Sequence, residues 1–333
     1  MLTGTFTRTM GIVLGTALLV AAFVMSLWLG TTRMPLATLY TALFDHDPTR
    51  IAHLVVITER LPRASIAALV GASLAVAGAL MQTLTRNPLA SPGILGINAG
   101  AMFFVVVAVA LLPATTPAHL VGAALTGACV AAALVVLLCG GTQGQTASLR
   151  VVLAGVAVTA LFVSLSQGLL VIDQQSFESV LYWLAGSVSG REMSLVTPLL
   201  PLYLGAAIGC MALVRHANAL LLGDEAVAGL GLSVAWVKLA LGLVVVVLAA
   251  SAVALAGMIG FVGLIVPHMA RAVFGVDHRW LLPGCALLGA VLLLVADVAA
   301  RFVMPPQEIP VGVMTALIGT PFFIYLARRK VNG

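Results

Sequence analysis

The sequence has 333 residues, of which 62% are hydrophobic and only 8% charged, with a formal net charge of +5 and a mean hydropathy of +1.16. Soluble domains carry about 25% charged residues, so this composition excludes an ordinary soluble enzyme and indicates a polytopic membrane protein. The positive charge is scattered and forms no basic run interleaved with aromatic residues, so it gives no argument for nucleic-acid binding. The four cysteines have no Cys-x-x-Cys spacing and indicate neither a disulfide framework nor a zinc site.

Ten apolar runs follow one another along the chain, each near the roughly 20 residues that cross a bilayer core of about 30 Å. We therefore predict an all-α polytopic membrane protein of about ten transmembrane helices, with residues 1–333 forming a single transmembrane domain. The first run is longer than the apolar part of a signal peptide and is interpreted as a retained span. The ten runs are 10–30, 64–82, 94–112, 118–140, 151–172, 193–214, 234–256, 258–274, 281–300 and 309–327.

The basic residues at the end of the chain set the predicted topology. Arg328, Arg329 and Lys330 favour the cytoplasmic side, and an even number of spans places the N-terminus on that side too. The longest connection, residues 31–59, then lies outside, and Pro35 is predicted to open a short interfacial helix in it.

A weak internal similarity relates Ser73–Leu80 to Ala252–Ile259. The two copies run in opposite directions in the predicted topology, so they indicate an inverted repeat of spans 2–5 and 7–10, as occurs in many transporters. A chance match between alanine-rich segments is the alternative. Within the second copy, glycines and Pro267 interrupt the run 258–274, which predicts either a short or broken helix or an interfacial loop.

No ATP-binding loop is encoded. The two lysines, Lys238 and Lys330, do not lie in a Gly-x-x-x-x-Gly-Lys-Ser/Thr motif, so energy must come from a partner ATPase or from an ion gradient. Asp297 is the one carboxylate that approaches mid-membrane, and it lies four residues before Arg301. A local ion pair on one helix face is favoured over a proton relay. The sequence has no His-Glu-x-x-His motif or nucleophile elbow, so no catalytic residue is predicted.

The polar connection at about residues 215–233 separates two apolar runs. Gly223 is predicted to cap a short helix, because Asp224 and Glu225 follow it and acidic residues stabilise the positive end of a helix. Ala226, Val227 and Leu230 would share one apolar face, and Gly229 and Gly231 would end the helix. The alternative is a solvated loop that only joins two spans.

Four ordered blocks then carry a family resemblance. The sequence resembles the FecCD-type permeases of type II ABC importers, which take up iron-siderophore complexes, haem and cobalamin. The blocks are Arg60–Ala101, which includes Asn87 and Pro88; Gly257–Arg271, which includes Pro267, His268 and Arg271; Asp277 through Asp297 and Arg301; and Glu308 through Pro321-Phe322-Phe323.

The resemblance implies a bacterial inner-membrane permease that pairs with a second permease subunit, identical or closely related. Two partner ATPase subunits would bind ATP and Mg²⁺, so this chain would bind no cofactor and no metal itself. A periplasmic or lipid-anchored substrate-binding protein would deliver the cargo. A ferric siderophore, such as a ferric citrate-like complex, is the expected cargo. Haem or cobalamin, an ion-coupled secondary transporter and a purely structural subunit are the alternatives.

The resemblance also implies roles for individual residues. Gly223–Leu232 would dock in a groove of the ATPase, and Arg60, Arg63 and Arg301 would receive glutamates of the binding protein, unless they only snorkel to the membrane surface. A gate is expected near Ser148 and Leu149, which depart from the small hydroxyl pair of the cobalamin permease. Thr159, Ser166 and Gln167 would line the path from one helix face, unless the hydroxyls bond to their own backbone.

Overall fold

The computed structural model describes residues 4–30, 34–112, 115–140, 147–172, 183–304 and 307–331; within these, the side chains of 147–148, 172, 325–327 and 329–331 are outside the description. All regular secondary structure in these ranges is helical. The α-helices are α1 (Thr5–Trp28), α2 (Leu36–Phe44), α3 (Ile51–Val55), α4 (Leu61–Thr85), α5 (Ile97–Leu111), α6 (Pro117–Cys139), α7 (Ala147–Ile172), α9 (Leu200–Leu222), α10 (Asp224–Gly229), α11 (Val234–Ala256), α12 (Val262–Phe274), α13 (His278–Ala300) and α14 (Val311–Val331).

Each of the ten predicted runs contains an apolar helix. Seven helical stretches are long and apolar enough to cross a membrane, and three are shorter, at Ile97–Leu111, Val262–Phe274 and Val311–Ile324. The seven are Thr5–Trp28, Ile51–Thr85, Pro117–Cys139, Leu149–Val171, Met193–Leu222, Val234–Ala256 and His278–Ala300. The all-helical membrane class is therefore confirmed, whereas ten crossings, the side of the termini and the inverted repeat stay predictions.

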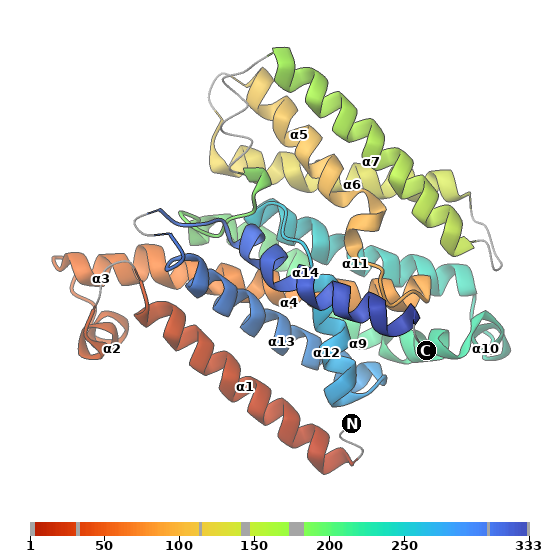
Figure 1. Ribbon diagram of the computed structural model, residues 1–333, viewed down its shortest axis with the longest axis horizontal. Helices are drawn as coiled ribbons and strands as arrows, with labels where there is room; N and C mark the ends of the chain where they lie inside the picture. The colour runs from red at the N-terminus through yellow and green to blue at the C-terminus, as the bar shows by residue number, and fades with distance from the viewer. Residues whose placement is uncertain are drawn as a thin grey trace.

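Helix α4 is the centre of the bundle. It packs against α1, α11, α12 and α13 (Figure 1), and nearly every residue after its first turn is buried. Glycines allow this close packing, because a Cβ on Gly71 would overlap the carbonyl oxygen of Gly289 in α13, and one on Gly78 would overlap that of Gly263 in α12. Small residues let helices approach where lipid supplies no hydrophobic drive. Helices α5, α6 and α7 form a second group on the other side of α11 (Figure 1).

The ends of several elements differ from the predicted ones. Helix α9 continues to Leu222, so residues 215–222 of the predicted connection 215–233 are helical and the segment between α9 and α11 is residues 223–233. The polar residues that suggested an earlier end include Asn218, whose amide is satisfied inside the bundle by Asp277 and His278. The short helix opened by Pro35 is confirmed as α2. The helix α3 and the π-helical turn Val56–Arg60, which run directly into α4, were not predicted.

The break in the eighth run is confirmed. Helix α12 begins only at Val262, after Phe261 at φ 66° and Gly257 at φ 73°. A left-handed backbone suits glycine, and here Gly257 also lies against the carbonyl oxygen of Trp183, where a Cβ would not fit.

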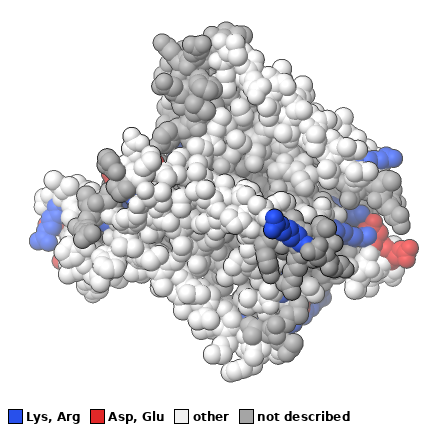
Figure 2. Space-filling model, in the orientation of Figure 1, with Lys and Arg blue, Asp and Glu red and all other residues white. Residues whose placement is uncertain are grey.

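The bundle has two distinguishable ends. One, the α10 end, holds α10, the C-terminal end of α4 and the α12–α13 turn; the other, the α2 end, holds α2, α3 and the start of α14 (Figure 1). On the face drawn in Figure 2, charged side chains gather toward these two ends and leave a broad uncharged surface between them. An uncharged surface of this kind suits contact with the hydrocarbon core of a bilayer, which is about 30 Å thick.

Candidate functional site

A cluster of five charged side chains lies at the α2 end. We call it the arginine network, and it comprises Arg60, Arg63, Asp297, Arg301 and Glu308. Arg60 and Arg63 flank Pro62 at the start of α4, and Asp297 and Arg301 lie at the end of α13. Because α4 and α13 pack against each other through Gly71 and Gly289, the start of one helix meets the end of the other.

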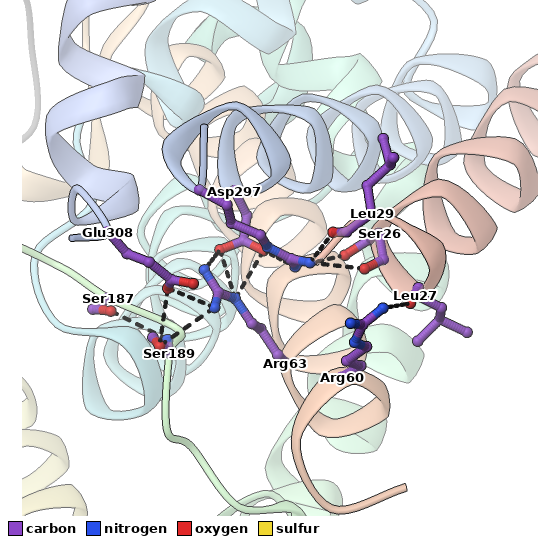
Figure 3. Close-up of polar contacts among 10 residues, drawn as sticks. Ser26, Leu27, Leu29, Arg60, Arg63, Ser187, Ser189, Asp297 and Glu308 are labelled. Atoms are coloured by element: carbon purple, nitrogen blue, oxygen red, sulfur yellow. Dashed lines mark hydrogen bonds and ion pairs between the residues drawn. The ribbon is translucent and has the colours of Figure 1, made fainter. Parts of the chain in front are cut away.

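Arg63 is the centre of the arginine network. Its Nε donates to both carboxylate oxygens of Asp297, at 3.0 and 3.1 Å, and one terminal nitrogen donates to Oδ1 at 2.9 Å. The other terminal nitrogen donates to Oε2 of Glu308 at 2.7 Å, so one guanidinium bridges two carboxylates (Figure 3). Charge-assisted bonds of this forked geometry are the strong ones, and they fix the orientation of Arg63.

Asp297 also forms the predicted ion pair within its own helix. A terminal nitrogen of Arg301 donates to Oδ2 of Asp297 at 2.5 Å, across one helical turn, and both side chains are almost completely buried. The prediction of a local ion pair is therefore confirmed. The structure adds a second cation, because the same carboxylate is shared with Arg63.

Arg60 and Arg301 close the end of helix α1. Arg60 donates to the carbonyl oxygen of Leu27 at 2.8 Å (Figure 3) and to that of Trp28 at 2.9 Å. Arg301 donates to the carbonyl oxygens of Ser26 and Leu29 at 2.8 and 2.7 Å. The last carbonyls of a helix lack partners within it and carry the negative end of its dipole, so two guanidinium groups stabilise them well.

The three arginines that are predicted to contact the binding protein differ in burial and in hydrogen-bond partners. Arg60 and Arg301 are buried and bonded to backbone carbonyls, so neither presents an exposed guanidinium in this conformation. Arg63 is half-buried, and its outer partner Glu308 is partly exposed. Contact of these residues with a binding protein stays a prediction, for which Arg63 is the best-placed residue.

The coupling segment, residues 223–233, lies at the α10 end. As predicted, Gly223 is the N-cap of α10, Asp224 and Glu225 occupy its first turn, and the helix ends at Gly229 with Gly231 at φ 76°. Asp224 is anchored by Arg86 at 2.5 Å and by Lys238 at 2.9 Å. The segment is therefore attached both to the end of α4 and to α11.

The predicted apolar face of α10 is wrong. Val227 is completely buried in this chain's own core, whereas Leu230 is 66% exposed and Ala226 is intermediate. Leu230 is the C-cap of α10 and its N–H still bonds to the carbonyl oxygen of Ala226 at 3.2 Å, so the difference in exposure comes from the packing of α10 against α9 and α11. Leu230 is therefore an exposed apolar side chain of this segment, as is Leu222 at the end of α9.

Helix α4 connects the two ends of the molecule. Arg63 lies in its first turn, and Arg86, which holds Asp224, is its C-cap. With a rise of about 1.5 Å per residue, the 25 residues of α4 span about 37 Å, more than the bilayer core of about 30 Å. A rigid buried helix thus joins the arginine network to the coupling segment.

The predicted gate and path residues of α7 differ in exposure. Leu149 and Gln167 are exposed and Thr159 is partly buried, but Ser166 is completely buried and its hydroxyl donates to the carbonyl oxygen of Phe162 at 2.7 Å. The alternative of a bond to the helix's own backbone is therefore correct for Ser166, which belongs to the buried stripe of α7 that includes Phe162. The side chain of Ser148 lies outside the described residues.

The remaining motif residues shape the bundle near the α10 end. Asn87 and Pro88 form the turn after α4, where the Asn87 side chain accepts from the N–H of Leu89 at 3.0 Å. In α12, Pro267 is buried, the ring of His268 packs against Phe322, and Arg271 donates to the Gln82 amide at 2.6 Å.

The sequence did not identify three polar partners. Glu308 and Gln82 hold the arginines Arg63 and Arg271, and Asn218 joins α9 to the start of α13. Each is a polar residue beside or inside an apolar run, and this pattern is the sequence signal that could have identified them. Among the described residues, no three His, Cys, Asp or Glu side chains gather as metal ligands.

The all-helical fold, its long apolar helices and the charged side chains at the two ends define a multi-pass membrane protein. The structure is similar to that of a solved protein titled as an inward-facing conformation of a putative metal-chelate type ABC transporter, with a TM-score of 0.85 and 30% identity over 96% of this chain and 98% of that one. In sequence, the chain is 46% identical to the probable siderophore transport system permease protein YfiZ of Bacillus subtilis, covering 94% of this chain and 93% of YfiZ. It is 41% identical to the hemin transport system permease protein HmuU of Yersinia pestis, covering 81% and 82%.

The chain belongs to the FecCD transport family, whose model matches residues 18–329. It is accordingly a permease subunit of an ABC importer, a transport subunit rather than a catalytic one.

Proposed function

We propose that this permease carries a ferric siderophore, such as ferric citrate or another ferric chelate, across the bacterial inner membrane. The supporting observation is the connection made by α4, which joins the arginine network at one end to the Asp224-anchored coupling segment at the other. In such a transporter, ATP acts at one end and the cargo is loaded at the other. Each event can affect the other only if both favour one conformation of the same structural element, and a rigid helix that contacts both sites is such an element. The 46% identity to a siderophore permease supports the cargo class.

The α2 end would face the binding protein and the α10 end the ATPase subunits. A carboxylate of the binding protein would approach Arg63 and compete with Glu308, the exposed one of its two acidic partners. Leu222 and Leu230 would enter the ATPase groove, while Asp224 holds the segment in place from inside. ATP and Mg²⁺ would be bound by those partner subunits, and a second permease subunit, identical or closely related, would complete the path.

Haem is the second candidate cargo, because the chain is 41% identical to a hemin permease. Cobalamin is the remaining alternative of the family. Specificity within the family would reside largely in the binding protein.

Transport by reconstituted proteoliposomes tests the proposal. With the cognate binding protein and ATPase subunits, the permease should take up iron-55 citrate or siderophore in an ATP-dependent manner that an uncoupler does not abolish. Replacing Gly223–Leu232 by a flexible linker should abolish uptake while leaving the protein folded. Uptake that survives removal of the ATPase but collapses with an uncoupler would establish an ion-coupled transporter instead. Uptake of haem without uptake of ferric chelates would select the second cargo.

A further inference from the structure

An apolar groove runs along the outside of the bundle between α4, α9, α11 and α13. Its volume is about 740 Å³, and its walls are almost entirely apolar, with Ala72, Ala207, Met211, Leu248, Leu282 and Ala286 among them. It is separate from both the arginine network and the coupling segment. Two arginines, Arg215 of α9 and Arg279 of α13, line the same groove at the α10 end.

The groove has the length of one membrane leaflet. On α9 it is lined by Tyr203, Ala207, Met211 and Arg215, which recur every four residues and so lie along one helix face. With a rise of about 1.5 Å per residue, the twelve steps from Tyr203 to Arg215 extend about 18 Å, close to the roughly 15 Å that is half of a 30 Å bilayer core. The apolar part of the groove therefore suits one extended acyl chain, and the arginines lie at the level of its headgroup.

The charges at the arginine end are available to a ligand. Arg215 and Arg279 are both exposed, and neither forms an ion pair with another described residue. The charge of Arg279 attracts the adjacent carboxylate of Asp277. That carboxylate accepts from the Asn218 amide at 2.7 Å and from the backbone N–H of Arg279 at 3.0 Å, and it forms no ion pair with the Arg279 guanidinium. Burial opposes the charged form of Asp277, but these hydrogen bonds hold its pKa below the ordinary value.

We propose that this groove binds an anionic glycerophospholipid, with one acyl chain along α9 and the phosphate between Arg215 and Arg279. Basic pockets between transmembrane helices bind anionic headgroups, and here the apolar and basic parts of the groove match the two parts of one lipid molecule. The bound lipid contacts α9, which leads into the coupling segment, and α13, which ends in the arginine network. The proposal does not depend on the cargo of the permease.

Native mass spectrometry of the full-length, delipidated permease in detergent tests this site. The protein is titrated with dioleoyl-phosphatidylglycerol and, separately, with the zwitterionic dioleoyl-phosphatidylcholine. The headgroup variant is Arg215→Gln with Arg279→Gln, and its control is Arg150→Gln, at an exposed arginine of α7 outside the groove. The acyl-chain variant is Ala207→Trp, which fills the groove, and its control is Ala212→Trp, at an exposed alanine of α9 outside it.

Wild type and Arg150→Gln should bind phosphatidylglycerol more tightly than phosphatidylcholine. Loss of both groove arginines should reduce this ratio of affinities about 30-fold, since one basic residue near an anionic lipid raises the affinity about fivefold. Ala207→Trp should weaken binding of both lipids, and Ala212→Trp should not. Equal preference in the double arginine variant and wild type would overturn the proposal, as would equal lipid binding by the two tryptophan variants. A dimer that Ala207→Trp splits without changing lipid binding would show that the groove is a subunit interface instead.

Discussion

Replacing Asp297 by asparagine removes one negative charge from the centre of the arginine network at nearly constant volume. Asp297 is 1% exposed and accepts from both Arg63 and Arg301. Without this charge, the buried guanidinium of Arg301 has only neutral acceptors, which are the amide oxygen at position 297 and the backbone and hydroxyl oxygens at the end of α1. Breaking a buried ion pair by removing one partner costs about 3–5 kcal/mol, so the free energy of unfolding of Asp297→Asn should fall by that amount.

Glu308→Gln is the matched control. Glu308 also pairs with Arg63, but its side chain is 23% exposed and Arg63 keeps Asp297 as a partner. An ion pair that solvent reaches contributes about 0–1 kcal/mol, so the control should lose no more than that. Equilibrium unfolding in mixed detergent and dodecyl sulfate micelles, followed by circular dichroism, measures both values.

A double-mutant cycle tests whether Asp297 compensates the buried charge of Arg301. Combining Asp297→Asn with Arg301→Met removes both charges of the buried pair, so the double variant should lose at least about 1 kcal/mol less than the sum of the two single losses. Additive losses, or equal losses for Asp297→Asn and Glu308→Gln, would show that the carboxylate does not compensate the buried arginines.

Three further outcomes are expected. Gly78→Ala should destabilise the protein by about 1–3 kcal/mol in the same unfolding titration, because the new methyl group overlaps the backbone of α12, whereas Gly242→Ala, in open space on α11, should be neutral or stabilising. Val227→Ala should cost about 1–3 kcal/mol of stability because the side chain is buried, and Leu230→Ala, on an exposed position, less than about 0.5 kcal/mol. In reconstituted transporter, however, Leu230→Ala should weaken ATPase-subunit binding in a pull-down measurement, and unchanged binding would contradict the proposed docking role. Asp224→Asn should keep the free energy of unfolding within about 1 kcal/mol of the wild-type value, since the ion pairs of Asp224 are partly exposed. It should also lower uptake in the proteoliposome assay, because it detaches the coupling segment from α4. Unaltered uptake would contradict that connection.

Much of the fold could be predicted because membrane burial is a property of continuous sequence. An apolar run long enough to span the bilayer must form a helix, since no water satisfies its backbone groups, and every predicted run contains one. Neighbouring residues in the sequence also predicted α2 after Pro35, the N-cap at Gly223 and the break before α12. It failed at the end of α9, because hydropathy could not show that Asn218 finds its partners on another helix.

The contacts of the site residues also fall into two groups, those that local sequence predicts and those that it does not. The sequence by itself determined the Asp297–Arg301 pair, because residues four apart on a helix are neighbours wherever the helix lies. It also determined that Asp224 begins a short helix between two apolar runs. These are contacts within one element, and residue spacing is enough to establish them.

Only the tertiary structure decided which partners lie across elements. Arg63 meets Asp297 across 234 positions of sequence, and Arg60 and Arg301 together close the end of α1. Val227 is buried and Leu230 exposed for the same reason, because their surroundings depend on how α10 packs beneath α9 and α11. Such contacts depend on how closely glycines let the helices approach, and residue order along the chain does not determine that packing.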